Sequence, residues 1–138
     1  MDYNIGAIKV FARQLKNARP ISPSTSITGP AMTLGTLLFQ RVWLQGMLVA
    51  CRENGCFVLD DGSSIIEIFL PKDFLQQQWK IGMYVMVIGA YSVGGSGSPV
   101  IKGHKIVDLS NFPDREAMWH LEVIEAYEMF YKSSMVEG

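Results

Sequence analysis

The sequence predicts a mainly β protein, with a single five-stranded, partly open barrel followed by a C-terminal α-helix. Short segments rich in alternating apolar residues lie between residues 37 and 107, separated by turn signals, which is typical of strands. The segment 113–131 instead has helical periodicity. A non-strand segment, 71–80, separates the third strand from the fourth. Five strands interrupted at that point follow the order of an OB-fold barrel, and a fragment of a five-stranded sandwich is the alternative.

The first predicted strand, residues 37–52, is long and rich in Leu, Val, Phe and Trp. Gly46 lies inside it, and a glycine in such a strand often marks a bend at which one strand serves both halves of a barrel. Asn54 and Gly55 follow as the strongest short-range hairpin signal in the chain. We therefore expect a two-residue turn and a return strand at 56–59.

The remaining strands are separated by a turn, a break and a glycine-rich loop. The break is expected to be a loop with a short helix, and the loop to be flexible. In chain order the predicted segments are the turn 60–62, the third strand 64–70, the break 71–80, the fourth strand 84–93, the Gly/Ser tract 94–98 and the fifth strand 100–107.

The N-terminal residues are expected to dock on this barrel. Residues 5–16 are interpreted as a short amphipathic helical segment, with a strand as the alternative for part of it. Its apolar side consists of Ile5, Ile8, Phe11, Ala12 and Leu15, and its polar side, interpreted as solvated, of Lys9, Arg13 and Lys16. The chain is thus divided into a docking segment and flexible loop at 1–36, the OB-fold barrel at 37–110, and an interaction helix with a tail at 111–138.

The C-terminal helix carries more apolar surface than contact with one small domain would cover. Pro113 at a first helical position, with Asp114 and Glu116 in the first turn, indicates where it starts. We expect the excess surface to pack against another protein chain. One predicted stripe consists of Trp119, Val123, Ala126, Tyr127 and Phe130, and it is continued by Ala117, Leu121, Ile124 and Tyr131.

Composition excludes several classes of protein. With 138 residues, 49% of them hydrophobic, the chain is long enough for one folded domain. A formal net charge of −1 argues against a broad electrostatic footprint for DNA, although acids dominate from Asp108 onward. No apolar run approaches the roughly 18 residues of a membrane span, and the N-terminus lacks a signal-peptide pattern. We expect a soluble, intracellular protein with no membrane partner.

We predict no catalytic, cofactor-binding or metal-binding residues. The sequence has no Gly-x-Ser-x-Gly elbow, and the Gly/Ser tract lacks the Lys-Ser/Thr ending of a phosphate-binding loop. A tight turn explains Asp60 and Asp61. His104 is interpreted as a barrel histidine on the same side of its strand as Ile106, and His120 has no second histidine at metal-binding spacing.

The two cysteines are interpreted as reduced, buried residues. With a two-residue turn at Asn54-Gly55, Cys51 would face Val58, and Cys56 would be its diagonal neighbour at about 7–8 Å. That separation is too large for an easy disulfide, and no matching His or Cys spacing indicates zinc.

Single-stranded DNA binding by an OB-fold requires a basic groove and outward aromatic side chains on which bases stack. Few Lys or Arg residues interleave with the candidate aromatic residues, so we interpret most of the candidates as core residues. They are Trp43, Phe57, Phe69, Tyr84 and Tyr91.

Four stretches resemble the family of RecQ-mediated genome instability protein 2, the small OB-fold subunit of the RecQ-mediated genome instability complex. They occur in order over most of the predicted fold: VWLQG at 42–46, GMYVMVIG at 82–89, KIVDLS at 105–110 and WHLEV at 119–123. More distantly, LEVIEA at 121–126 is similar to the middle subunit of replication protein A.

The resemblance implies a non-catalytic scaffold subunit that heterodimerises, through its C-terminal helix, with the larger genome-instability OB-fold subunit. It further implies a nuclear complex with a RecQ-type helicase and a type IA topoisomerase that dissolves double Holliday junctions, with little or no direct nucleic acid binding by this chain. The alternative is a single-stranded DNA-binding subunit of a replication-protein-A-like complex. An enzyme that uses the OB-fold as a side domain is disfavoured, since the chain has no room for a second domain.

Seven residues are predicted to bind partners. Trp119 is preferred as an anchor, and the resemblance places it at the larger subunit, with the alternative that it covers its own barrel. Lys105 is either an exposed strand lysine or, by resemblance, a contact with the further enzyme partner. The full set is Trp119, Leu121, Val123, Ala126, Tyr127, Phe130 and Lys105.

Overall fold

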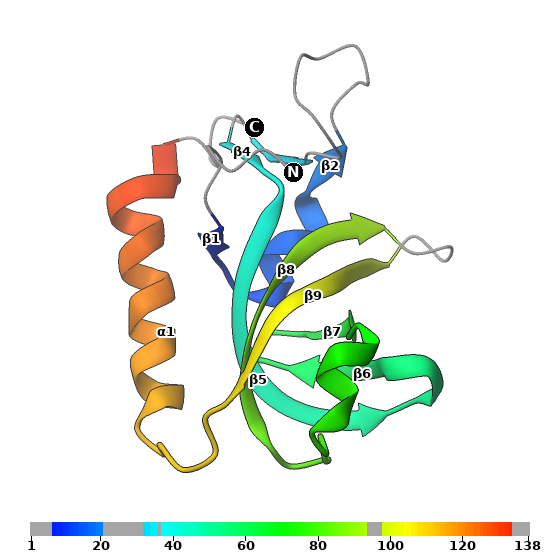
Figure 1. The fold of residues 1–138 in the computed structure, drawn as a ribbon. Coiled ribbons are helices and arrows are strands. Elements are labelled where there is room, and N and C mark those ends of the chain that lie inside the picture. Colours follow the sequence, from blue (N-terminus) through cyan, green and yellow to red (C-terminus); the bar gives the residue numbers. More distant parts are fainter. Residues whose placement is uncertain (1–6, 21–31, 36, 94–97, 134–138) are drawn as a thin grey trace.

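The computed structural model describes residues 7–20, 32–35, 37–93 and 98–133. The loop expected at 20–36 and the Gly/Ser tract therefore fall mostly outside the described residues, as do Ile5 and the end of the C-terminal tail. Five strands close a barrel in the order β5-β6-β7-β9-β8, because β8 also pairs with β5 (Figure 1). These strands are β5 (Arg41–Cys51), β6 (Cys56–Asp60), β7 (Ile65–Phe69), β8 (Tyr84–Val93) and β9 (Pro99–Asp108).

The predicted OB-fold is confirmed, including the bend at Gly46. Strand β5 pairs with β8 from Arg41 to Met47 and with β6 from Met47 to Cys51, so one strand serves both halves of the barrel. A Cβ at Gly46 would lie 2.5 Å from the carbonyl oxygen of Asp60, so the close approach of the β6 backbone requires glycine.

The first predicted strand is in fact two strands. Gln40 separates β4 (Leu37–Phe39) from β5, and β4 belongs to a small second sheet with β2 (Arg19–Pro20) and β3 (Met32–Leu34). The Gln40 carbonyl still accepts a hydrogen bond from the backbone N–H of Tyr91 at 3.1 Å. The chain therefore stays attached to β8 where it changes sheets.

The N-terminal segment docks on the barrel as a short strand and a 3₁₀-helix. Strand β1 (Ile8–Lys9) pairs in parallel with β5, and η1 (Ala12–Asn17) follows it. Ile8, Val10, Ala12 and Leu15 are at most 6% exposed. The segment thus completes the core of the domain rather than lying on its surface.

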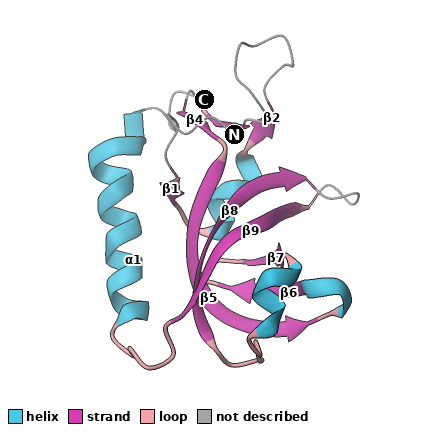
Figure 2. Ribbon diagram, viewed as in Figure 1, coloured by secondary structure: helices cyan, strands magenta, loops and turns pink. Residues whose placement is uncertain are grey.

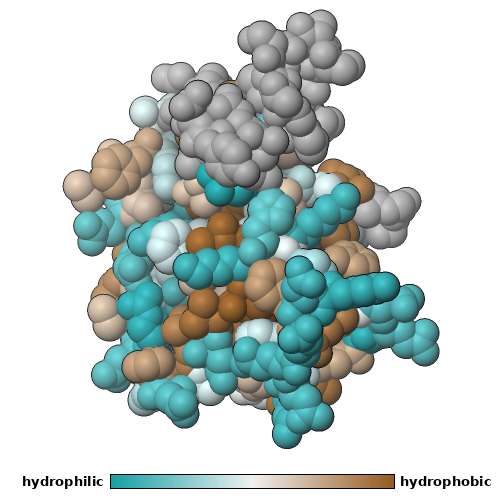
Figure 3. All heavy atoms as spheres, in the orientation of Figure 1, coloured by the Kyte–Doolittle hydropathy of each residue, from teal (hydrophilic) through white to brown (hydrophobic). Residues whose placement is uncertain are grey.

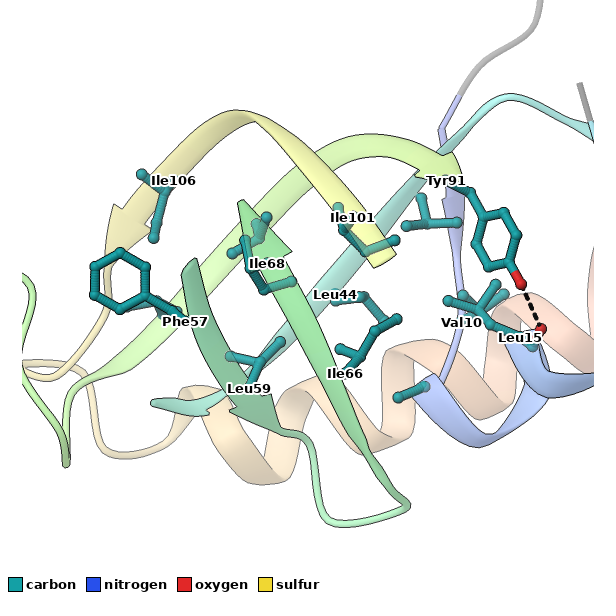
Figure 4. Close-up of a cluster of buried hydrophobic side chains, with 14 of the residues drawn as sticks. Val10, Leu15, Leu44, Phe57, Leu59, Ile66, Ile68, Tyr91, Ile101 and Ile106 are labelled. Carbon is teal, nitrogen blue, oxygen red and sulfur yellow. Dashed lines mark hydrogen bonds between the residues drawn. The ribbon is translucent and has the colours of Figure 1, made fainter. Parts of the chain in front are cut away.

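The core runs through the barrel from Phe57 and Ile106 at one end to Val10, Leu15 and Tyr91 at the other (Figure 4). Tyr91 donates a hydrogen bond from its hydroxyl to the Leu15 carbonyl at 3.2 Å, which joins β8 to η1. Leu44, Leu59, Ile66, Ile68 and Ile101 fill the space between these ends.

The turn predicted at Asp60–Gly62 is confirmed, and one of its aspartates has a further structural role. Asp60 accepts the Gly62 N–H, whereas Asp61 accepts the Ser63 N–H with one carboxylate oxygen, each at 2.9 Å. The other oxygen of Asp61 accepts the Ala12 N–H at 2.6 Å, at the start of η1. This bond fixes the N-terminal segment to the barrel, and Asp61 is only 4% exposed.

The hairpin at Asn54-Gly55 differs from the two-residue turn expected. Both residues have positive φ, 61° and 75°, but the loop spans three residues, η2 (Glu53–Gly55). Arg52 closes it by donating its N–H to the Cys56 carbonyl at 2.7 Å. The register therefore shifts by one, and Cys51 is opposite Phe57 instead of Val58.

The prediction that both cysteines are buried is wrong for one of them. Both are free, but Cys51 is exposed and only Cys56 is buried. Burial raises the pKa of the Cys56 thiol, and a hydrogen bond to Glu67 at 3.3 Å raises it further.

Three helical segments complete the fold (Figure 2). The predicted short helix of the break is η3 (Lys72–Gln76), between β7 and β8. The C-terminal helix is α1 (Arg115–Ala126), which continues as one π-helical turn, η4 (Tyr127–Tyr131). Figure 1 shows α1 on the outside of the barrel, alongside β1 and β5.

Candidate partner-binding site

Helix α1 starts two residues later than the sequence predicted. Pro113 and Asp114 form a turn, and the first residue in helical structure is Arg115, whose N–H donates to the Phe112 carbonyl at 3.0 Å. Asp114 accepts the Met118 N–H through its carbonyl at 3.1 Å and is the N-terminal flanking residue. The short link from β9 brings the helix back across the outside of β5.

One face of α1 lies against the barrel. Trp119, Val123 and Ala126 are 0%, 1% and 8% exposed, and their spacing of four and three residues places them on one side of the helix. The ring of Trp119 packs on that of Trp43 from β5, with 6.0 Å between centroids. We call Trp119, Val123 and Ala126 the inner face.

Charged groups hold the edge of the inner face. Lys9 on β1 places its Nζ 3.3 Å from Glu122 Oε1 and 4.6 Å from the centroid of the Trp43 ring. Arg115 approaches the other oxygen of Glu122 at 3.2 Å. Lys9, which the sequence suggested was part of a solvated face, instead joins β1 to α1.

The opposite side of the helix is also apolar, and it is exposed. At about 100° per residue, Leu121 and Ile124 point away from Trp119 and Val123. Figure 3 shows apolar and polar residues alternating along the edge of the molecule where α1 runs. The residues that we call the outer face, with their exposures, are Met118 (48%), Leu121 (67%), Ile124 (53%), Met129 (64%) and Phe130 (67%).

The predicted partner-binding residues of the helix therefore fall into two groups. Trp119, Val123 and Ala126 lie on the inner face. The position of Trp119 therefore agrees with the alternative interpretation, in which it covers its own barrel. Leu121 and Phe130 lie on the outer face. Tyr127 is half-buried between the two.

Phe130 lies away from the stripe on which the sequence placed it. In a regular α-helix it would follow Trp119, Val123 and Ala126 on one side. The turn from Tyr127 to Tyr131 is π-helical, with more residues per turn, so positions beyond Ala126 are rotated relative to the α-helical stripe. This rotation turns the Phe130 ring into solvent. Single π-helical turns are often found at functional sites.

Lys105 is exposed, on a β-bulge of β9. Lys105 pairs with Ile88, but the next pair is Gly103 with Gly89, so His104 is an extra residue in the strand. His104 consequently faces solvent beside Lys105, which is exposed on the side of the strand opposite to Ile106. The expectation that His104 shares the inward side of Ile106 is wrong because the bulge breaks the alternation.

The bulge lies near the positive side chain of Arg41 on β5. The pKa of His104 is lowered, first by partial desolvation and then by the charge of Arg41 on β5. Both effects favour the neutral form of His104.

The candidate base-stacking residues are mostly occupied by other contacts. Phe57 and Tyr91 are buried in the core, and Trp43 packs on Trp119. Tyr84 is half-buried and donates to Gln45 at 3.3 Å, and burial, followed by the charge of Glu116, raises its pKa to about 12. Phe69, at 38% exposure, is the most accessible of the five.

The described part of the chain contains no group of three or more His, Cys, Asp or Glu residues placed to hold a metal ion. In the same residues, no helix is both long enough and apolar enough to cross a membrane.

These features define an OB-fold protein with a helix packed on the outside of its barrel, and solved structures agree. The chain is similar to one chain of the S. pombe Stn1-Ten1 complex, with a TM-score of 0.73 at 13% identity over 94% of this chain and 96% of that one. It is also similar to a chain of yeast RPA bound to ssDNA, with a TM-score of 0.69 at 22% identity over 94% and 96%.

The family follows from sequence. The family model for RecQ-mediated genome instability protein 2 matches residues 6–127. The Gallus gallus protein of that name is 31% identical over 127 residues, which cover 88% of this chain and 92% of that protein. The chain belongs to the RecQ-mediated genome instability protein 2 family, as the resemblance predicted, and is thereby a genome-stability OB-fold protein.

Proposed function

We propose that this chain is a non-catalytic scaffold subunit that pairs with the larger genome-instability OB-fold subunit through the outer face of α1. The pair would belong to a nuclear complex of a RecQ-type helicase and a type IA topoisomerase that dissolves double Holliday junctions. In this proposal catalysis and most DNA contacts belong to the other subunits, and the chain itself binds nucleic acid little or not at all.

The observation that carries the proposal is that α1 has two apolar faces, of which the barrel covers only one. The inner face is already buried against β1 and β5. The five residues of the outer face are each 48–67% exposed and follow one another along the helix. Several exposed apolar side chains gathered on one side of a folded helix are typical of a protein–protein interface.

Two further observations support it. The chain has an OB-fold similar to chains from the Stn1-Ten1 complex and from RPA, both of which are assemblies of several subunits. Met118, Leu121 and Ile124 follow one another at a spacing of three residues, and docking of one apolar helix face on a partner groove is a recurrent mode of recognition.

The proposal is tested by placing one charge on the outer face. Leu121→Asp should abolish co-purification with the co-expressed larger subunit, because the carboxylate would have to be desolvated in an apolar contact. Ile81→Asp is the matched control, since Ile81 is 65% exposed and Leu121 67%, but Ile81 lies at the turn before β8.

Thermal unfolding should show both variants folded, since neither side chain is buried. Loss of pairing in Leu121→Asp alone supports the proposal. Equal co-purification of the wild type and Leu121→Asp would exclude the outer face as the interface.

We propose a separate role for Lys105 in recruiting the helicase, because it is exposed on the bulge of β9. Lys105→Ala should leave pairing with the larger subunit intact and weaken capture of the helicase in a three-component pull-down. Lys102→Ala is the control, since Lys102 is exposed on the same strand. Equal loss in both variants would indicate a general charge effect and contradict a specific role for Lys105.

A further inference from the structure

A pocket of about 360 Å³ opens where the C-terminal end of the helix passes β1 and β5. Trp43 lines it from β5, Ala126 from the end of α1, and Phe130 and Tyr131 from η4. Tyr131 is held there because its hydroxyl accepts the backbone N–H of Lys9 at 3.5 Å. The pocket therefore adjoins the outer face at Phe130.

Three charged side chains line this pocket, and one of them is not neutralised. Lys9 and Glu122 form an ion pair, and Arg115 also approaches Glu122. Glu125 is exposed and forms no ion pair with any described residue. Glu125 is thus the carboxylate of this pocket that remains available to a cation.

Two aromatic residues that line this pocket, Trp43 and Phe130, differ in whether a cation already covers the ring. The face of Trp43 is already covered by Lys9, whose Nζ lies 4.6 Å from the ring centroid. Phe130 is 67% exposed, with Tyr131 at 6.4 Å between centroids as its ring neighbour. An uncommitted carboxylate beside an uncommitted aromatic ring suits a cation that can use both.

We propose that this pocket binds an arginine side chain of the larger subunit, with the guanidinium on Glu125 and stacked against Phe130. Arginine fits better than lysine because its planar head binds a carboxylate bidentately and stacks on aromatic faces. The inference rests on the proposed function, since it places this contact at the end of the interface made by the outer face.

A second copy of the chain is a poorer occupant. Two outer faces brought together would place Glu125 and Glu128 of one copy near the same acids of the other, and like charges at an interface oppose association. The helix and its π-turn, residues 115–131, contain four Glu residues against Arg115 as the only Lys or Arg. A symmetric pairing of two such helices would therefore offer the pocket no basic residue other than Arg115, which already contacts Glu122.

The test uses the full chain and the larger subunit, with affinity measured by titration calorimetry. Glu125→Gln should weaken binding about tenfold, as expected when one member of an interfacial charge pair is neutralised. Glu116→Gln is the matched control because Glu116 is also an exposed carboxylate of α1 without an ion pair among the described residues, and it does not line the pocket. It should change affinity by about twofold at most.

A charge exchange identifies the occupant. Glu125→Arg should nearly abolish binding, and one Arg→Glu change among the arginines of the larger subunit should restore it. If wild type binds and Glu125→Gln matches Glu116→Gln, the pocket inference fails while the proposed function stands.

Two other results would overturn the inference. If wild type does not bind the larger subunit, the proposed function fails, and the inference fails with it. If the isolated chain sediments as a dimer that Glu125→Gln dissociates, the pocket binds a second copy.

Discussion

The inner and outer faces of α1 have similar composition and opposite surroundings. Both consist of apolar residues at helical spacing, but Trp119 and Val123 are removed from solvent whereas Leu121 and Ile124 are 67% and 53% exposed. The inner face contributes to the stability of this chain alone. In the proposed function a partner covers the outer face, so the two faces of one helix would separate folding from assembly.

The largest expected effect is on stability at the inner face. Trp119→Ala should lower the free energy of unfolding by about 3–5 kcal/mol, because a fully buried indole is lost from its contact with Trp43. Leu121→Ala should change it by less than about 0.5 kcal/mol. Urea denaturation of both variants measures this difference, and similar values for the two would contradict the distinction between the faces.

The ion pairs at the edge of the inner face should contribute less. Glu122→Gln removes the contacts to Lys9 and Arg115 and should cost about 1 kcal/mol at low salt, because these groups are half-buried. Glu128→Gln removes an exposed pair with Lys132 and should cost close to nothing. The cost for Glu122→Gln should shrink in about 1 M NaCl, and an unchanged cost would show that packing rather than charge is responsible.

The smallest expected effect at neutral pH involves Tyr84, whose pKa is raised first by burial and then by the charge of Glu116 at the start of α1. Its pKa rises from 10.0 to about 12 on folding, so folding favours the neutral phenol. That contribution is present below pH 10.0 and is lost as pH rises towards about 12. Stability should therefore fall less steeply over this range in Tyr84→Phe than in the wild type, and equal slopes in denaturation series would exclude a role for Tyr84.

The sequence predicted the parts of the fold that depend on local pattern. Strand β8 begins at Tyr84 and ends at Val93 as expected, and the amount of apolar surface on the helix was also apparent. Periodicity could not say which side of that helix meets the barrel, because both sides are apolar. A helical wheel drawn at constant pitch also misplaces Phe130, since the π-helical turn that rotates it has no sequence signal.

Other features depend on contacts between distant segments. The parallel pairing of β1 with β5 and the bond from Ala12 to Asp61 join residues far apart in the chain, and neither has a local motif. The bulge at His104 turns that side chain outward although the surrounding residues alternate regularly. Lys9 became part of the site only because β1 places it over Trp43.

The most direct measurement is oxidation of methionine side chains, with and without the larger subunit, quantified by mass spectrometry. Met118 and Met129 on the outer face are 48% and 64% exposed, and Met47 on β5 is 44% exposed and serves as the internal control. We expect the larger subunit to protect Met118 and Met129 while Met47 oxidises at its original rate. Protection of Met47, with Met118 and Met129 unprotected in the complex, would contradict the assignment of the outer face.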